Sequence, residues 1–273
     1  MDANRNPQAT QIADESMVRT LRHQIAAIWP QERPLLARYA LPEQAQVLDV
    51  GCGTGEATVR LAAHYPRATV IGTDVVPQVL DVARREHAAL APRVSFEEGD
   101  GFHLRFASAS QNLVVCRHVT HMVPQPQHLL AELARVTTRG GWLHVLSEDY
   151  GMLHFPERSG VDPDRLWHEG AIEFIHATGT DGRIGRKTLP LMRELGFTDL
   201  RIDFLAIDTE RVARETLIGI FTAWRDGYTD ALAGATRLAR DEVMKLFACV
   251  LGSLADPNAY AVWQVPVVSG RRA

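Results

Sequence analysis

Cysteine is scarce in this chain, which has three in its 273 residues: Cys52, Cys116 and Cys249. They lie far apart and lack C-x-x-C spacing, so we expect neither a disulfide framework nor a structural zinc site. Such usage is typical of proteins in a reducing compartment, and the cytoplasm is the expected localisation.

The chain also lacks long hydrophobic runs and an excess of charge of one sign. No segment approaches the roughly 18 apolar residues of a membrane span, and the polar N-terminal segment MDANRNPQATQIADES has no apolar core like that of a signal peptide. The formal net charge is -4, and the basic residues are scattered. A nucleic-acid-binding surface would need clustered Arg and Lys, so we expect a small-molecule substrate, no nucleic acid and no membrane span.

What is present is a glycine turn directly after a buried strand, in the run VLDVGCGTG at 47–55. Gly51, Gly53 and Gly55 leave no side chains where the chain must turn against a ligand, and a helix opens near Glu56. A dinucleotide-binding fingerprint would have its last glycine at position 56. A carboxylate there would repel a pyrophosphate, so the turn disfavours NAD.

Further acidic residues stand where later strands end. The segment 68–77 is a second buried strand that ends at Asp74, roughly twenty residues beyond the glycines, where such folds place a carboxylate on ribose hydroxyls. Three more strands follow within 93–106, 112–119 and 142–150. Strands alternating with helices predict a parallel sheet whose carboxyl ends meet at one crevice. The residues at these ends are Asp49 to Gly55, Asp74, Asp100, Arg117 with His118, and Glu148 to Tyr150.

The G-x-G-x-G spacing preceded by Asp49 resembles the first motif of class I S-adenosylmethionine (SAM) methyltransferases. The resemblance to the ubiquinone and menaquinone biosynthesis type and its small-molecule relatives covers about 45–150. It implies an α/β, Rossmann-like fold with a mostly parallel seven-stranded sheet, helices on both faces and helical lid insertions. It also implies SAM as cofactor and S-adenosylhomocysteine as product. The cofactor-binding residues expected from it are Asp49, Gly51, Cys52, Gly53, Gly55, Asp74, Val75, Asp100, Gly101, Phe102 and Arg117.

The rest of the chain is expected to complete a single methyltransferase domain over 1–273. Residues 1–44 form an N-terminal helical cap, 45–150 the SAM-binding core, 151–183 a lid insertion, and 184–273 the C-terminal part of the sheet with a helical insertion at 211–254. In the cap, Met17, Leu21, Ile25, Ile28 and Trp29 have helical spacing up to Pro30, and a second short helix runs through Leu35, Leu36 and Tyr39. The insertion at 211–254 departs from the family's usual hairpin. Two roles stay open for it, a cap on the pocket and the interface of a homodimer.

The expected reaction is displacement at a sulfonium methyl group by an O, N or C atom of a small molecule. Positioning supplies much of the catalysis, and a base helps where the acceptor must lose a proton. His118 is the strongest candidate, since it follows the fourth strand; His121 shares its face if the chain turns helically there. Glu148 and Tyr150 complete the catalytic candidates. Packing or a solvated turn would explain any of these residues equally simply.

Several alternatives remain open at this point. A metal could bind His118, His121 and the acids at 148–149, but no ligand spacing requires it, so no metal is expected. Arg183, Arg186 and Lys187 either hold an acidic substrate group or lie on a solvated surface. A non-catalytic SAM-binding or interaction protein would use the same residues. An NAD-dependent oxidoreductase is less favoured, and a nucleic-acid N-methyltransferase would show [DN]-P-P-[YFW] where this chain has CRHV. Apolar and aromatic residues in the lid favour a hydrophobic or aromatic acceptor, typical of secondary metabolism.

Overall fold

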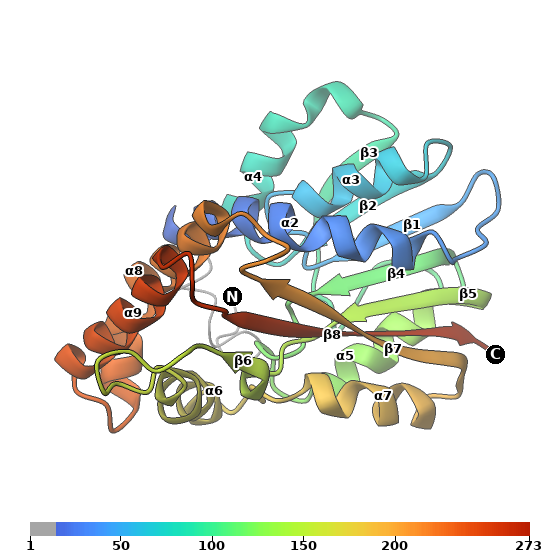
Figure 1. The fold of residues 1–273 in the computed structure, drawn as a ribbon. Coiled ribbons are helices and arrows are strands. Elements are labelled where there is room, and N and C mark those ends of the chain that lie inside the picture. Colours follow the sequence, from blue (N-terminus) through green and yellow to red (C-terminus); the bar gives the residue numbers. More distant parts are fainter. Residues whose placement is uncertain (1–14) are drawn as a thin grey trace.

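Parallel strands form a sheet at the centre of the molecule, and two of them, Gln46–Val50 and Gln111–Arg117, are buried on both faces (Figure 1). The computed structural model describes residues 15–273; the start of the expected cap and the Met17 side chain lie outside the described residues. The parallel strands stand in the order β3-β2-β1-β4-β5. They are β1 (Gln46–Val50), β2 (Thr69–Asp74), β3 (Val94–Glu98), β4 (Gln111–Arg117) and β5 (Thr137–Leu146).

Antiparallel strands complete the sheet. β8 (Val262–Arg272) lies between β5 and β7 (Phe197–Asp208) and is antiparallel to both. The expected count of seven strands is short by one, because the chain after β5 pairs again with β8 as the two-residue β6 (Leu153–His154). The expected Rossmann-like α/β class is confirmed.

Helices cover both faces of the sheet, because neighbouring residues of β1 point to opposite sides. Val47 belongs to a buried cluster with Leu36 and Leu61, and Leu48 to another with Leu130 and Met192. The first face therefore carries α2 (Glu15–Leu36) and α3 (Glu56–His64). The second carries α5 (Pro126–Val136) and α7 (Gly185–Glu194), and α4 (Pro77–Glu86) joins β2 to β3 through the short turn η1 (Ala88–Leu90).

One expected helix end is wrong. α2 does not stop at Pro30 but continues through it to Leu36. A proline inside a helix costs about 3 kcal/mol, yet packing across it holds the turn: Ile28 and Leu36 are fully buried, and Gln31 exchanges two hydrogen bonds with the Ala206 backbone in β7. α5 ends at Val136, and Gly140 and Gly141 lie inside β5.

A helical layer stands beyond the carboxyl ends of the parallel strands, where α6, α8 and α9 gather (Figure 1). The lid segment contributes η2 (Tyr150–Met152), the π-helical turn η3 (Leu166–Ala171) and α6 (Ile172–Ala177). The insertion contributes α8 (Arg214–Ala235) and α9 (Arg240–Ala255), with Trp167, Phe221 and Trp224 packed between the segments. Among the described helices, none is long and apolar enough to cross a membrane.

Candidate active site

A cavity of about 530 Å³ is lined by the strand-end loops, the lid segment, α8 and α9. Its volume is in the range of small-molecule sites. Leu21, Gln24 and Ile25 of α2 also line it. The structure brings together fourteen of the fifteen residues expected from the sequence, Asp49, Gly51, Cys52, Gly53, Asp74, Val75, Asp100, Gly101, Phe102, Arg117, His118, His121, Glu148 and Tyr150.

The remaining one, Gly55, does not line the cavity. It is the N-cap residue of α3 with a φ of 83°, and a Cβ there would lie 2.5 Å from the Phe96 ring. Its expected cofactor contact stays a prediction that the cavity lining does not support. The residue must be glycine for a backbone reason, because the chain turns left-handed while packing against an aromatic ring.

Two acids, the buried Asp49 and the half-buried Asp74, fasten the segments around the glycine turn. Asp49 accepts a hydrogen bond of 2.7 Å from the Thr58 hydroxyl, and burial raises the pKa of its carboxyl to about 6. Asp74 accepts the backbone N–H of Gly53 at 2.9 Å and that of Val76 at 3.0 Å, and burial raises its pKa as well. Asp74 thus ties the glycine turn to the end of β2 and lines the cavity.

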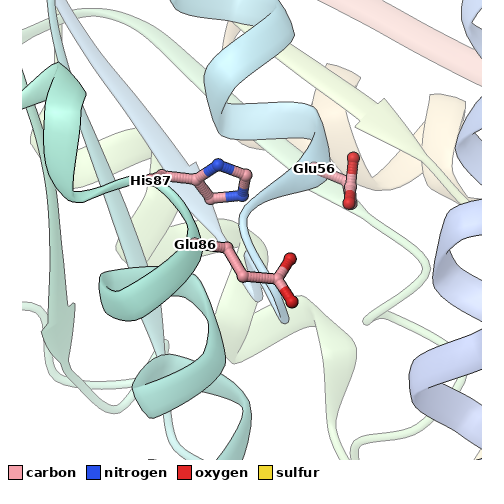
Figure 2. Close-up of side chains that lie close together, drawn as sticks. All are labelled: Glu56, Glu86 and His87. Atoms are coloured by element: carbon pink, nitrogen blue, oxygen red, sulfur yellow. The ribbon is translucent and has the colours of Figure 1, made fainter.

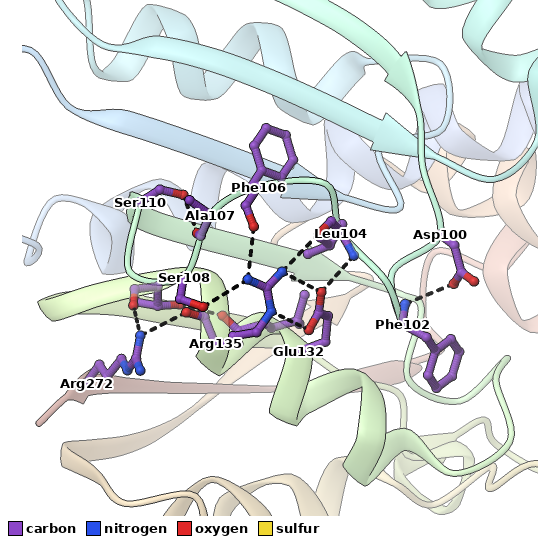
Figure 3. Close-up of polar contacts among 12 residues, drawn as sticks. Asp100, Phe102, Leu104, Phe106, Ala107, Ser108, Ser110, Glu132, Arg135 and Arg272 are labelled. Carbon is purple, nitrogen blue, oxygen red and sulfur yellow. Dashed lines mark hydrogen bonds and ion pairs between the residues drawn. The ribbon is translucent and has the colours of Figure 1, made fainter.

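The loop after β3 is fastened to α5, as Figure 3 shows. Asp100 accepts the Phe102 N–H at 2.9 Å. Arg135 donates to the Leu104 carbonyl at 2.9 Å and pairs with Glu132, whose carboxylate accepts the Leu104 N–H at 2.7 Å. These bonds fix the loop that carries Asp100 and Phe102 to the cavity wall.

Arg117, at the end of β4, belongs to a buried network that sequence reasoning missed. Its Nε donates to both carboxylate oxygens of Glu32 in α2, at 2.9 and 3.1 Å. Glu32 also accepts from His144 Nε2 at 3.1 Å, and His144 Nδ1 lies 2.7 Å from the Tyr39 hydroxyl. Burial alone raises the pKa of Glu32, but Arg117 and His144 outweigh it and lower the pKa to about 2. One guanidinium nitrogen of Arg117, Nη2, is buried without a hydrogen-bond partner.

The signal for Glu32 was present in the helical spacing. Ile25, Ile28 and Glu32 stand at i, i+3 and i+7, so the acid lies on the apolar face of α2. A carboxylate on a buried face requires a cationic partner, but the partner, 85 residues away, is not visible in the sequence.

His118 and Glu148 form a hydrogen-bonded pair between the ends of β4 and β5. The bond joins His118 Nδ1 to Glu148 Oε1, and the other polar atoms of the pair, Nε2 and Oε2, are buried without partners. Burial raises the pKa of Glu148, while the charge and hydrogen bond of His118 lower it more. His118 has a φ of 57°, a strained conformation for a residue with a side chain.

His121 and Tyr150 stand beside this pair with their rings in edge contact, at a centroid distance of 5.7 Å. Burial lowers the pKa of His121 to about 4, and burial raises the pKa of Tyr150 above its ordinary value. Both side chains are therefore neutral near pH 7.

The basic residues at the start of α7 do not line the cavity. Arg186 pairs with the buried Asp149 at 2.6 Å, and Lys187 pairs with Asp181 at 2.6 Å. Neither they nor Arg183 line the cavity. The interpretation in which they hold an acidic substrate group is not supported by this placement.

Among the described residues, one group of potential metal ligands lies close together: Glu56, Glu86 and His87, drawn in Figure 2. The Arg22 guanidinium already pairs with Glu86 at 2.7 Å and lies 3.7 Å from Glu56. His87 Nε2 is 3.2 Å from the Thr54 carbonyl. The Arg22 guanidinium therefore already supplies this cluster with the positive charge that a metal ion would bring. The alternative set of His118, His121 and the 148–149 acids does not form such a group within 15–273.

Comparison with known proteins shows which families this chain resembles. A family model described as a methyltransferase domain matches residues 47–141. A trans-aconitate 2-methyltransferase of Deinococcus radiodurans is 37% identical over 178 residues, 64% of this chain and 64% of that protein. These matches support a class I SAM-dependent methyltransferase family. A demethylmenaquinone methyltransferase of the same organism is 39% identical over 101 residues, 37% of this chain and 42% of the relative.

Solved methyltransferases share the fold beyond the matched core. A phosphoethanolamine N-methyltransferase of Haemonchus contortus matches with a TM-score of 0.58 and 19% identity, covering 89% of this chain and 52% of that one. The geranyl diphosphate C-methyltransferase of Streptomyces coelicolor matches with a TM-score of 0.56 and 16% identity, covering 90% and 79%. The two curated relatives named above are matched over 42% and 64% of their own lengths.

Proposed function

We propose that this methyltransferase transfers the methyl group of SAM to an O, N or C atom of a small molecule bound in the cavity. The observation that carries the proposal is that one cavity joins the glycine turn and its acids to the His118–Glu148 pair. When bound, SAM supplies a methyl group on a sulfonium centre, which a nucleophile can displace.

The residues at one end of the cavity fit a cationic, nucleoside-containing cofactor. Asp49 and the turn from Gly51 to Gly53 would hold its amino-acid end, Asp74 the ribose hydroxyls and Asp100 the adenine amino group. Arg117 adds a donor for a carboxylate, because its Nη2 is buried without a partner. A buried donor of this kind is costly unless a ligand or water satisfies it.

His118 would act as the base at the other end. When Nδ1–H donates its hydrogen bond to the Glu148 carboxylate, the lone pair of Nε2 is left to take the proton of the acceptor, and the ionised Glu148 stabilises the imidazolium that forms. The absence of a partner for Nε2 supports this role. An acceptor carbon or oxygen that must lose a proton gains most from it.

We also propose that the insertion at 211–254 caps the pocket. Trp224, Tyr228 and Leu232 of α8 and Phe247 of α9 line the cavity. The apolar side of the insertion is thus turned toward the site, which favours the cap over the homodimer interface.

The test compares His118→Asn with wild-type protein in methyl transfer from methyl-deuterated SAM to components of a small-molecule extract. His128→Asn is the matched control, because His128 is exposed on α5. We expect His118→Asn to lower turnover about 10²- to 10⁴-fold while the SAM Kd changes less than about threefold. An unchanged rate would remove His118 from the mechanism; SAM binding without turnover in wild-type protein would favour a non-catalytic SAM-binding role.

A further inference from the structure

The part of the cavity beyond His118 is formed by rings and aliphatic side chains from four segments. The ring centroids lie 6.2 Å apart for Trp167 and Trp224 and 6.0 Å apart for Phe174 and Tyr228, so these aromatic side chains pack against one another in two pairs. We call this part the acceptor lobe, and it consists of Leu166, Trp167, Phe174, Trp224, Tyr228 and Phe247.

The polar groups of the acceptor lobe are neutral. Trp167 Nε1 is a donor that is buried without a partner. Burial raises the pKa of the Tyr228 hydroxyl to about 12, so it stays protonated near pH 7. Such groups can orient an oxygen atom of a ligand but cannot neutralise a charge.

The charged residues that line the cavity are mostly acidic. The carboxylates are Asp49, Glu56, Asp74, Glu98, Asp100 and Glu148. Within the described chain, Arg117 is the one Arg or Lys in the lining, and Glu32 already compensates its charge. A cationic cofactor suits this mostly acidic lining. A carboxylate or phosphate in the acceptor lobe would be desolvated without a partner, which is strongly unfavourable.

We propose that the acceptor is an uncharged aromatic molecule with an ionisable hydroxyl group of the phenol type. It would enter neutral, lie against the rings of the acceptor lobe and lose its proton only beside His118. The proton then moves to Nε2, the oxygen forms its bond to the methyl carbon, and the electron pair of the broken C–S bond goes to sulfur. This inference deepens the proposed function and rests on it.

The test measures the binding of three probes of the same shape to protein saturated with S-adenosylhomocysteine at pH 7.5: 2-naphthol, 2-naphthoate and 2-naphthylmethylammonium. We expect 2-naphthol to bind at least about tenfold more tightly than 2-naphthoate, because the lobe offers the anion no counter-charge. Equal or tighter binding of the carboxylate, or tighter binding of the ammonium probe, would overturn the proposal. Failure of S-adenosylhomocysteine itself to bind would instead refute the proposed function, so the two failures are distinguishable.

A charge placed in the cavity lining beside the lobe should reverse the preference. Leu232 is 3% exposed and lines the cavity, whereas Ala235 is exposed at the end of the same helix. We expect Leu232→Arg to favour 2-naphthoate over 2-naphthol and Ala235→Arg to leave the wild-type order intact. If Leu232→Arg no longer binds S-adenosylhomocysteine, Trp224→Leu replaces it, with an expected loss of about tenfold in 2-naphthol affinity at unchanged S-adenosylhomocysteine affinity. Unaltered probe binding in the variant used would contradict the assignment of the lobe.

Discussion

Replacing Glu32 by Gln tests the buried network that joins α2 to β4. The side chain has no exposed surface, and its charge is met by Arg117 and His144. The pKa of Glu32 falls from 4.5 to about 2, and each unit is worth about 1.4 kcal/mol, so the ionised carboxylate stabilises the fold by about 3 kcal/mol at pH 7. Breaking a buried ion pair by removing one partner costs a similar amount.

The sign of the pH dependence follows from the lowered pKa. The contribution is complete above the unfolded-state pKa near 4.5 and is lost as the pH falls toward 2. Urea unfolding should therefore show Glu32→Gln less stable by about 3 kcal/mol at pH 7 and by about 2 kcal/mol at pH 3.5. Glu169→Gln is the matched control; its exposed pair with Arg165 should contribute less than about 1 kcal/mol. A loss below about 1 kcal/mol for Glu32→Gln, or one that does not shrink in acid, would refute the reasoning.

Three further predictions concern the cofactor end of the cavity. Because burial raises the pKa of Asp49 to about 6, SAM affinity should fall about tenfold from pH 7.5 to pH 5 by calorimetry, and Asp49→Asn should abolish this dependence; a wild-type profile without slope would contradict it. Asp74→Ala removes the acceptor of two backbone N–H groups and should raise the SAM Kd at least about tenfold, whereas unaltered affinity would show that Asp74 is not a ligand. Arg135→Ala should destabilise the loop after β3 by about 2 kcal/mol and increase its hydrogen exchange; a loop as protected as in wild-type protein would exclude the clamp.

The sheet and the cofactor end of the cavity could be predicted because their signals are local. β1 and β2 are short, largely apolar runs, and the acids Asp49, Asp74 and Asp100 lie close to strand ends, so parallel topology alone brings them together. Gly55 fits the same spacing but does not line the cavity; at this residue α3 begins close to the Phe96 ring. Sequence spacing alone cannot distinguish a glycine that faces the cofactor from one that is required by local packing.

What could not be predicted depends on contacts between distant segments. Pro30 reads as a helix end, yet α2 continues because it packs on β7 through Gln31. The pairing of Glu32 with Arg117, and the hydrogen bond between His118 and Glu148, join residues 85 and 30 positions apart. The acceptor lobe likewise assembles from the lid segment and the insertion, which could be delimited but not oriented from their sequences.

The most direct test of methyl transfer in this cavity incubates purified protein with methyl-deuterated SAM and a small-molecule extract from its native source, followed by mass spectrometry. Our account predicts a small-molecule product that carries the labelled methyl group and forms only when the protein is present. SAM binding verified by calorimetry, in an extract that contains neutral phenols but yields no labelled small molecule, would contradict it.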